Sequence, residues 1–167
     1  FLEGWFDLNG LTKGAYQYGY EFTNNVFGTL TVPTNTTTAA IELELGLVGN
    51  PSSDGLVQNN LFRNVRNAMY VYQKAGTGTD KFANLTFRNN KCLNTRLGEF
   101  VAANSAEGGT SNWKITNNTF RRLGSAPAMN AGIMLPGFGN NSDWLIRHNI
   151  ISGFSTAPVL QNAPIGV

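Results

Sequence analysis

One short pattern of apolar and polar positions recurs five times along the chain. Each copy has an apolar residue, a polar residue, Asn or His, then Asn, any residue and a second apolar residue. Counted at the second Asn (25, 60, 90, 118 and 149), the copies are separated by 35, 30, 28 and 31 residues. A near-constant period of this length is typical of stacked repeats. The five copies are Phe22–Phe27, Val57–Phe62, Phe87–Cys92, Ile115–Phe120 and Ile146–Ile151.

Two kinds of short apolar stretch flank each Asn pair. An alternating stretch comes before it, as in Asn84–Phe87, and predicts a β-strand. A few polar or Gly residues after the pair lead to a second apolar stretch, and loops rich in Gly and Asn separate the copies. A unit of two or three short strands cannot bury its apolar side alone, so the copies must stack. The second stretches are Ile41–Leu45, Ala68–Tyr72, Phe100–Ala103, Gly132–Leu135 and Val159–Gln161.

Stacking gives the repeated asparagines a structural role. Equivalent turns in adjacent coils lie about 4.8 Å apart, and a side-chain amide carries both donors and an acceptor. One Asn above another can therefore form a hydrogen-bonded ladder. Asn also tolerates the left-handed backbone conformation of tight turns. The predicted ladder is Asn25, Asn60, Asn90, Asn118 and Asn149. The predicted interior columns are Phe22, Val57, Phe87, Ile115 and Ile146, and Phe27, Phe62, Cys92, Phe120 and Ile151.

The composition agrees with a chain of many strands and turns. Charged residues make up only 13% of the 167 residues, against about 25% in an average soluble domain. Asn, Gly and Thr replace them, with 22 Asn and 19 Gly. This composition argues against long exposed helices, while the 41% hydrophobic content argues against disorder. The sequence therefore predicts an all-β fold.

Charge and residue counts exclude several classes of function. A net charge of +2 is too weak a bias to indicate nucleic-acid binding. The single Cys92 excludes an internal disulfide framework and a cysteine zinc site, and the single His148 excludes a multi-histidine metal centre. No apolar run approaches the roughly 20 residues that cross a membrane. We therefore expect no metal, no cofactor and no membrane span.

An Asn-containing turn between short strands, repeated in every coil, resembles the right-handed parallel β-helix of the pectate-lyase-like superfamily. The resemblance covers roughly residues 20 to 165. It implies a right-handed parallel β-helix of about five coils. It also implies carbohydrate substrates, because the superfamily holds pectate and alginate lyases, polygalacturonases, chondroitinase-type lyases and phage tailspikes. Five coils span only about 24 Å of stacked strands, which is short for an enzyme of this kind.

The carboxylates do not match a glycosidase of this family. Hydrolases of the superfamily use clustered Asp, whereas the four aspartates here, Asp7, Asp54, Asp80 and Asp143, are scattered. No two of them occupy equivalent positions in adjacent copies, which argues against a paired-carboxylate mechanism. Lyases of the superfamily use Arg or Lys as the base. The sequence names no catalytic residue and leaves open whether the protein is an enzyme.

Basic residues recur at related positions in the repeat. Arg66 and Arg96 each follow the ladder Asn by six residues, and Arg88 and Arg147 share one position two copies apart. A basic stripe would suit an acidic polysaccharide, since Arg pairs with carboxylates in a bidentate manner. Exposed Arg on a solenoid also serves solubility and discourages edge aggregation, and this second interpretation stays open. The arginines assigned to the stripe are Arg63, Arg66, Arg96, Arg121 and Arg122.

Other single residues have two interpretations each. Tyr70 and Tyr72 share one face of a strand, and Glu42 and Glu44 share a face of the equivalent strand in the preceding coil. If these faces point outward they form a platform for sugars; in the opposite phase both tyrosines belong to the core. His148 replaces the first Asn of its pair, which favours a turn residue over a general acid or base. Cys92 aligns with Phe and Ile, which favours a buried small hydrophobe.

These observations together predict recognition of an extracellular or cell-surface polysaccharide, by a module of a lyase-like enzyme or of a phage-type adhesin. The alternative is a non-catalytic structural solenoid, such as a spacer or a virion component. Either function places the protein outside the cell, on its surface or in a virion. Residues 1–20 are expected to form a starting coil or cap, and residues 21–167 the repeats.

The two ends of the stack lead to a further expectation. The chain starts at Phe1 without a signal peptide, so we interpret it as a processed or excised segment. An open β-helix end exposes apolar core and unpaired strand edges. Nothing after Val159 resembles a capping helix. We therefore expect further chain, a partner protein or a homo-oligomer at the C-terminal end.

Overall fold

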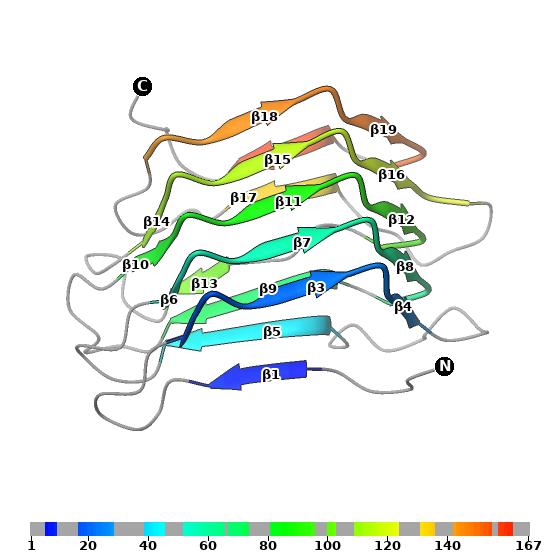
Figure 1. Cartoon of the computed structure of the whole chain (residues 1–167). Coiled ribbons are helices and arrows are strands. Elements are labelled where there is room, and N and C mark those ends of the chain that lie inside the picture. Colours follow the sequence, from blue (N-terminus) through cyan, green and yellow to red (C-terminus); the bar gives the residue numbers. More distant parts are fainter. Residues whose placement is uncertain are drawn as a thin grey trace.

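The computed structural model describes residues 6–9, 17–28, 39–45, 52–65, 67–73, 81–95, 100–102, 109–123, 131–135, 142–154 and 157–161. The described residues form twenty β-strands and no helix, and all their pairings are parallel. Strands far apart in the sequence lie side by side, in coils stacked along one axis (Figure 1). In Figure 1 the coils rise right-handed from β1, the usual sense for parallel strands. The predicted parallel β-helix is confirmed.

The strands form four faces of the helix. Sheet I consists of β3 (Glu21–Thr23), β7 (Leu56–Gln58), β11 (Thr86–Arg88), β15 (Lys114–Thr116) and β18 (Leu145–Arg147). Sheet II consists of β4 (Val26–Gly28), β8 (Leu61–Arg63), β12 (Lys91–Leu93), β16 (Thr119–Arg121) and β19 (Ile150–Ser152). These two five-stranded sheets meet at the Asn pairs.

The other two faces complete each coil. Sheet III consists of β1 (Phe6–Asn9), β5 (Ala39–Leu45), β9 (Asn67–Gln73) and β13 (Phe100–Ala102). The pair β17 (Ala131–Leu135) and β20 (Ala157–Gln161) holds the same place in the last two coils. Sheet IV consists of β2 (Gln17–Tyr18), β6 (Ser52–Ser53), β10 (Lys81–Ala83) and β14 (Gly109–Ser111). We number the coils 1 to 5 by their strands in sheet I. Within the segment 1–20, β1 pairs with β5 and β2 with β6.

Left-handed corner residues lie five residues apart in each coil, although Arg122 at the third corner of coil 4 has no positive φ. In coil 3 they are Asn84, Asn89 and Asn94, with φ of 56°, 55° and 54°. Between them lie three-residue strands, and the residue after each corner residue points inward. Asn and Asp adopt this backbone region more readily than other residues with a side chain. The corner positions of all coils are Gly19, Asp54, Asn84, Asn112 and Asp143; Asn24, Asn59, Asn89, Asn117 and His148; and Asn64, Asn94 and Gly153.

The predicted Asn ladder is present at the corner between sheets I and II. The backbone N–H of Asn60 donates to Oδ1 of Asn90 at 2.9 Å, and Nδ2 of Asn60 donates to the same oxygen at 3.0 Å. Nδ2 of Asn90 also donates to the carbonyl of Val57 in the coil below, at 2.9 Å. The same three bonds join each pair of adjacent ladder residues from Asn25 to Asn149. Asn60, Asn90 and Asn118 are buried.

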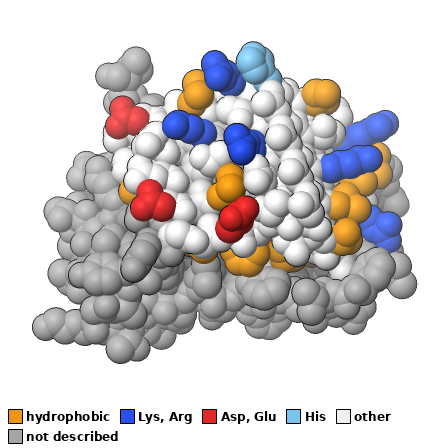
Figure 2. Space-filling model, viewed as in Figure 1, with side chains coloured by type: hydrophobic (Ala, Val, Ile, Leu, Met, Phe, Trp, Pro, Cys, Tyr) orange, Lys and Arg blue, Asp and Glu red, His pale blue; other side chains and the backbone are white. Residues whose placement is uncertain are grey.

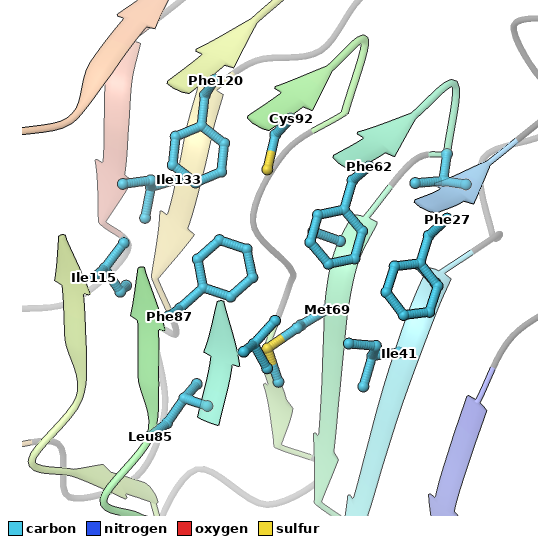
Figure 3. Packing of buried hydrophobic residues seen from close by; sticks show 14 of the residues in the cluster. Phe27, Ile41, Phe62, Met69, Leu85, Phe87, Cys92, Ile115, Phe120 and Ile133 are labelled. Carbon is cyan, nitrogen blue, oxygen red and sulfur yellow. The ribbon is translucent and has the colours of Figure 1, made fainter. Parts of the chain in front are cut away.

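Aromatic and aliphatic side chains fill the interior in columns (Figure 3). The register places the two predicted interior columns in line. The rings of Phe27 and Phe62 stack at 4.9 Å, and Phe87 lies 5.8 Å from Phe62 and 6.2 Å from Phe120. Cys92 is fully buried among these rings, and desolvation raises the pKa of its thiol well above its usual range. The expected buried hydrophobe is confirmed at this position.

The last coil is less covered than the middle ones. Its inward side chains Trp144, Ile146 and Ile151 are half-buried, whereas the equivalent residues of coils 3 and 4 are buried. Ile150 on sheet II is 65% exposed. The C-terminal rung therefore presents apolar surface, and no described strand pairs with the outer edges of β18 and β19.

Candidate functional site

Sheets I and II present two outward positions on each three-residue strand, the first and the third. The middle residue points inward, so strand register aligns the outward residues in two columns per sheet. On sheet II the third-position column runs Gly28, Arg63, Leu93, Arg121 and Ser152. The first-position column of sheet II runs Val26, Leu61, Lys91, Thr119 and Ile150.

Three cations alternate between the two columns of sheet II. Arg63 holds the third position in coil 2, Lys91 the first position in coil 3 and Arg121 the third position in coil 4. Arg63 is half-buried, and Lys91 and Arg121 are exposed. The other outward residue on β8 and on β12 is Leu, so this row of cations runs over partly apolar surface.

Sheet I carries the same alternation one coil further along. Arg88 holds the third position in coil 3, Lys114 the first in coil 4 and Arg147 the third in coil 5, and all three are exposed. On β11 and β15 the other outward residue is a threonine, Thr86 or Thr116. The row on sheet I therefore pairs each of its first two cations with a hydroxyl group.

A neutral side chain orients one of these cations. Nε of Arg88 donates to Oε1 of Gln58 at 2.9 Å, and Gln58 occupies the same column in the coil below. An amide fixes the guanidinium without cancelling its charge, and the two terminal nitrogens still point away from the bond. Arg88 is thus positioned to bind an anion by donating two parallel hydrogen bonds to it.

The two rows of cations are not neutralised by described carboxylates. None of the six side chains forms an ion pair with a described residue. The outward positions of the two sheets hold a single acidic residue, Glu21 in coil 1, while Asp54 and Asp143 lie at the corner before sheet I. Figure 2 shows basic side chains gathered in two groups on the viewed face, with acidic ones to the left of and below the first group. Both faces thus have an excess of positive charge.

The predicted arginines fall into two sets. Arg63 and Arg121 share one column of sheet II, two coils apart, as described above. Arg122 is half-buried at the corner after β16, and its backbone N–H donates to the carbonyl of Ser152 at 3.0 Å. Arg66 and Arg96 lie outside the described residues. The predicted alignment of the last two arginines is therefore still a prediction.

The tyrosine positions are described in the backbone alone. The register of β5 and β9 pairs Glu42 with Tyr70 and Glu44 with Tyr72. The strands thus bring the two glutamates and the two tyrosines alongside each other in sheet III. The sugar platform proposed from these four residues stays a prediction.

Sequence reasoning missed the lysines of both rows and the bond between Gln58 and Arg88. Lys91 and Lys114 become visible when positions are counted from the left-handed corner residue, because the second and fourth residues after each corner residue point outward. Counting from the ladder Asn alone grouped arginines by distance along the chain. It did not separate outward positions from inward ones.

The remaining polar candidates have structural positions. His148 is exposed with φ of 55°, in the same corner column as Asn117. Nδ2 of Asn84 donates to Oδ1 of Asp54 at 2.9 Å, which places this aspartate in a second hydrogen-bonded column. No group of three His, Cys, Asp or Glu residues able to hold a metal ion occurs in the described ranges. Nor does this part of the chain contain a helix long and apolar enough to cross a membrane.

Comparisons with protein-family models, with curated proteins and with solved structures find no significant match for this chain. The parallel β-helix with its Asn ladder therefore rests on strand register and hydrogen bonds, and the surface chemistry is the guide to function.

Proposed function

We propose that this β-helix recognises an acidic polysaccharide outside the cell, on a cell surface or in a virion. It would act as a module of a pectate-lyase-like enzyme or of a phage-type adhesin. The observation that carries the proposal is the pair of cation rows on sheets I and II, which no described carboxylate neutralises. Adjacent cationic faces attract an extended polyanion and favour binding that weakens as salt increases.

The uncharged neighbours of the cations favour a glycan over a nucleic acid. Threonine hydroxyls and the Gln58 amide can donate to and accept from sugar hydroxyls. Single-stranded nucleic acids are usually held by aromatic side chains that stack on the bases. The described outward positions of sheets I and II hold no aromatic residue.

A non-catalytic structural solenoid is the second candidate. The specific observation in its favour is that the buried ladder asparagines are all used in bonds between coils. These polar groups hold the stack together and are not available to a ligand. In this candidate the outward cations serve solubility.

Binding measurements separate the two candidates. Polymannuronate and hyaluronan would be titrated into the whole chain by calorimetry at low and physiological salt, with neutral dextran and oligo-dT as controls. Salt-sensitive binding of either acidic glycan, without binding of dextran, supports the proposal. If neither acidic glycan binds, the structural solenoid is the better description. An increase in ultraviolet absorbance during incubation, from an unsaturated product, would identify a lyase.

The exposed C-terminal rung favours an assembly. The side chain of Asn149 donates to the carbonyl of Ile115 in the coil below. The backbone N–H of each lower ladder residue donates to the Asn of the next coil, whereas that of Asn149 has no acceptor among the described residues. Further chain, a partner protein or a second copy would cover this rung and the exposed Ile150. Light scattering on the native protein tests this part of the proposal, and a stable 18.1 kDa monomer would contradict coverage by a second copy.

A further inference from the structure

The cations of sheet I change sides from one coil to the next. Arg88, Lys114 and Arg147 occupy the third, first and third positions of three successive strands. Adjacent strands lie about 4.8 Å apart, and the first and third residues of a strand are separated by about 6.6 Å. The positive groups therefore form a zigzag along the helix axis, with Arg88 and Arg147 about 9.6 Å apart in one column.

Hydroxyl groups lie opposite the first two cations of the zigzag, and Leu145 lies opposite the third, Arg147. Thr86 lies beside Arg88 on β11, and Thr116 lies beside Lys114 on β15. Each of these strands thus offers one cation and one hydroxyl, and the two exchange places between coils 3 and 4. A ligand that fits these two strands has an anion and a neutral polar group on each unit, and successive units have opposite orientations.

The first cation of the row is oriented before any ligand binds. Gln58 holds Nε of Arg88 from the coil below, at 2.9 Å. Less rotamer freedom is then lost when the guanidinium binds an anion, so Arg88 is the natural anchor of the row.

We propose that sheet I binds a linear polyuronate along the helix axis, with one acidic sugar on each of coils 3, 4 and 5 and successive carboxylates on alternate sides. The inference rests on the proposed function and names its ligand and face. A sugar in an extended glycan is roughly as long as one strand spacing of about 4.8 Å, so three successive sugars can lie over three successive strands. Polymannuronate has an acidic group on every sugar, and its successive sugars are turned over.

Sheet II is an internal control for the charge pattern. Arg63, Lys91 and Arg121 repeat the zigzag, but the companion residue is Leu61 on β8 and Leu93 on β12. The charges are equivalent, but a hydroxyl accompanies only one of the three cations, Thr119 beside Arg121, whereas on sheet I hydroxyls accompany two of three. Sheet I is therefore the better match, because it has one more hydroxyl beside its cations and an Arg88 that Gln58 orients.

The test compares matched variants of the two sheets in the whole chain. One triple variant carries Arg88→Gln, Lys114→Gln and Arg147→Gln, and the other carries Arg63→Gln, Lys91→Gln and Arg121→Gln. Both lose three positive charges. We expect the sheet I variant to bind polymannuronate at least about tenfold more weakly, since each exposed ion pair contributes about two- to fivefold, and the sheet II variant to lose much less. Circular dichroism checks that both variants keep the fold.

A second ligand distinguishes binding to the alternating cations from binding by overall positive charge. Hyaluronan has an acidic group on alternate sugars only, so its carboxylates can reach Arg88 and Arg147 but not Lys114. Lys114→Gln alone should weaken polymannuronate binding about threefold and leave hyaluronan binding unchanged. Equal losses for the two glycans would overturn the zigzag.

The outcomes separate this inference from the proposed function. If wild type binds acidic glycans and the two triple variants are weakened equally, the polyuronate site on sheet I is wrong while polysaccharide recognition stands. If wild type binds no acidic glycan, the proposed function fails and the inference fails with it.

The role of Gln58 has its own measurement. Gln58→Glu keeps an acceptor for Nε of Arg88 but places a negative charge beside it, so polymannuronate binding should fall about as much as in Arg88→Gln. Gln58→Leu should have a smaller effect, and raising the salt should reduce the difference between the two Gln58 variants. Unchanged polymannuronate binding in Gln58→Leu would exclude the positioning role.

Discussion

Two of the columns of side-chain amides along the stack differ in burial: the middle of the ladder is buried, and the corner column before sheet I is exposed. The ladder column has three hydrogen bonds between adjacent coils, and Asn90 in it is 2% exposed. The corner column before sheet I has one bond between adjacent side chains: Asn84 donates to Asp54 at 2.9 Å, and Asn112 donates to Asn84 at 2.9 Å. Asn84 is exposed.

The comparison teaches that similar bond lengths carry different consequences. Buried donors and acceptors that lose a partner cannot turn to water, whereas exposed ones can. The two asparagines are also there for different backbone reasons. Asn84 has φ of 56°, while Asn90 has no positive φ and follows a left-handed residue, Asn89. The ladder asparagine is selected by its amide, and the corner asparagine by its backbone.

The largest expected effect is at the buried column. Asn90→Ala leaves the backbone and side-chain donors of Asn60 and the carbonyl of Val57 without their partner. We expect the free energy of unfolding to fall by about 3 kcal/mol or more, since each buried unpaired group costs about 1–3 kcal/mol. Urea unfolding measures the change. Asn90→Gly should not recover stability, and a loss below about 1 kcal/mol would contradict a structural ladder.

The buried side of coil 3 should also respond to alkaline pH. Burial raises the pKa of the Cys92 thiol in the folded protein, so as pH rises the thiol ionises first in the unfolded chain. The stability contributed by the neutral thiol is complete below about pH 8.5 and falls above it, by up to about 1.4 kcal/mol per pH unit. Unfolding at pH 8 and pH 10 measures this loss. Cys92→Ala is the control, and an equal pH dependence in the variant would count against the assignment.

A smaller effect is expected at the exposed column. Asn84→Ala places a residue with a Cβ in the left-handed region without the amide that favours it, at a cost of about 1 kcal/mol. In Asn84→Gly the free energy of unfolding should lie within a few tenths of a kcal/mol of wild type, because glycine readily adopts this conformation. The same urea titration applies. Equal losses from Ala and Gly would show that the amide bonds, and not the backbone, select Asn at this corner.

The smallest effect on stability is expected at Asn89, the residue before the ladder residue Asn90. Asn89 is exposed, has φ of 55°, and its backbone N–H donates to the carbonyl of Thr116 at 3.2 Å. Asn89→Gly keeps this bond and should change stability by less than about 0.5 kcal/mol. A large loss would mean that the first Asn of the pair also belongs to the ladder.

The sequence was sufficient for the ladder because one residue type serves it in all five coils. Asn alone supplies the acceptor and donors in this geometry, so the column is visible as a repeated letter. The other corner columns were missed because Gly, Asp, Asn and His can all occupy a left-handed corner. Their common property is a positive φ, which a comparison of residue types does not detect.

The candidate site could be predicted only in part for a related reason. Arg63 and Arg121 were grouped correctly by their place in the repeat, and the register puts them in one column. Lys91 and Lys114 were overlooked because each lies in a different column from the arginines of its row. Recognising the row requires two sides of a strand to be read together. The bond of Arg88 to Gln58 joins residues 30 positions apart, and no local pattern indicates it.

The direction of the ladder bonds bears on how the chain folds as it is made. In every pair of coils the earlier Asn donates its backbone N–H to the oxygen of the later one. A chain that emerges N-terminus first therefore always has one newest rung whose donor faces water. The next coil brings the missing oxygen and, through its own amide, binds a carbonyl of the coil already in place. The hydrogen bonds thus suit a stack that grows in the direction of synthesis, in which each rung is completed by the chain that follows it.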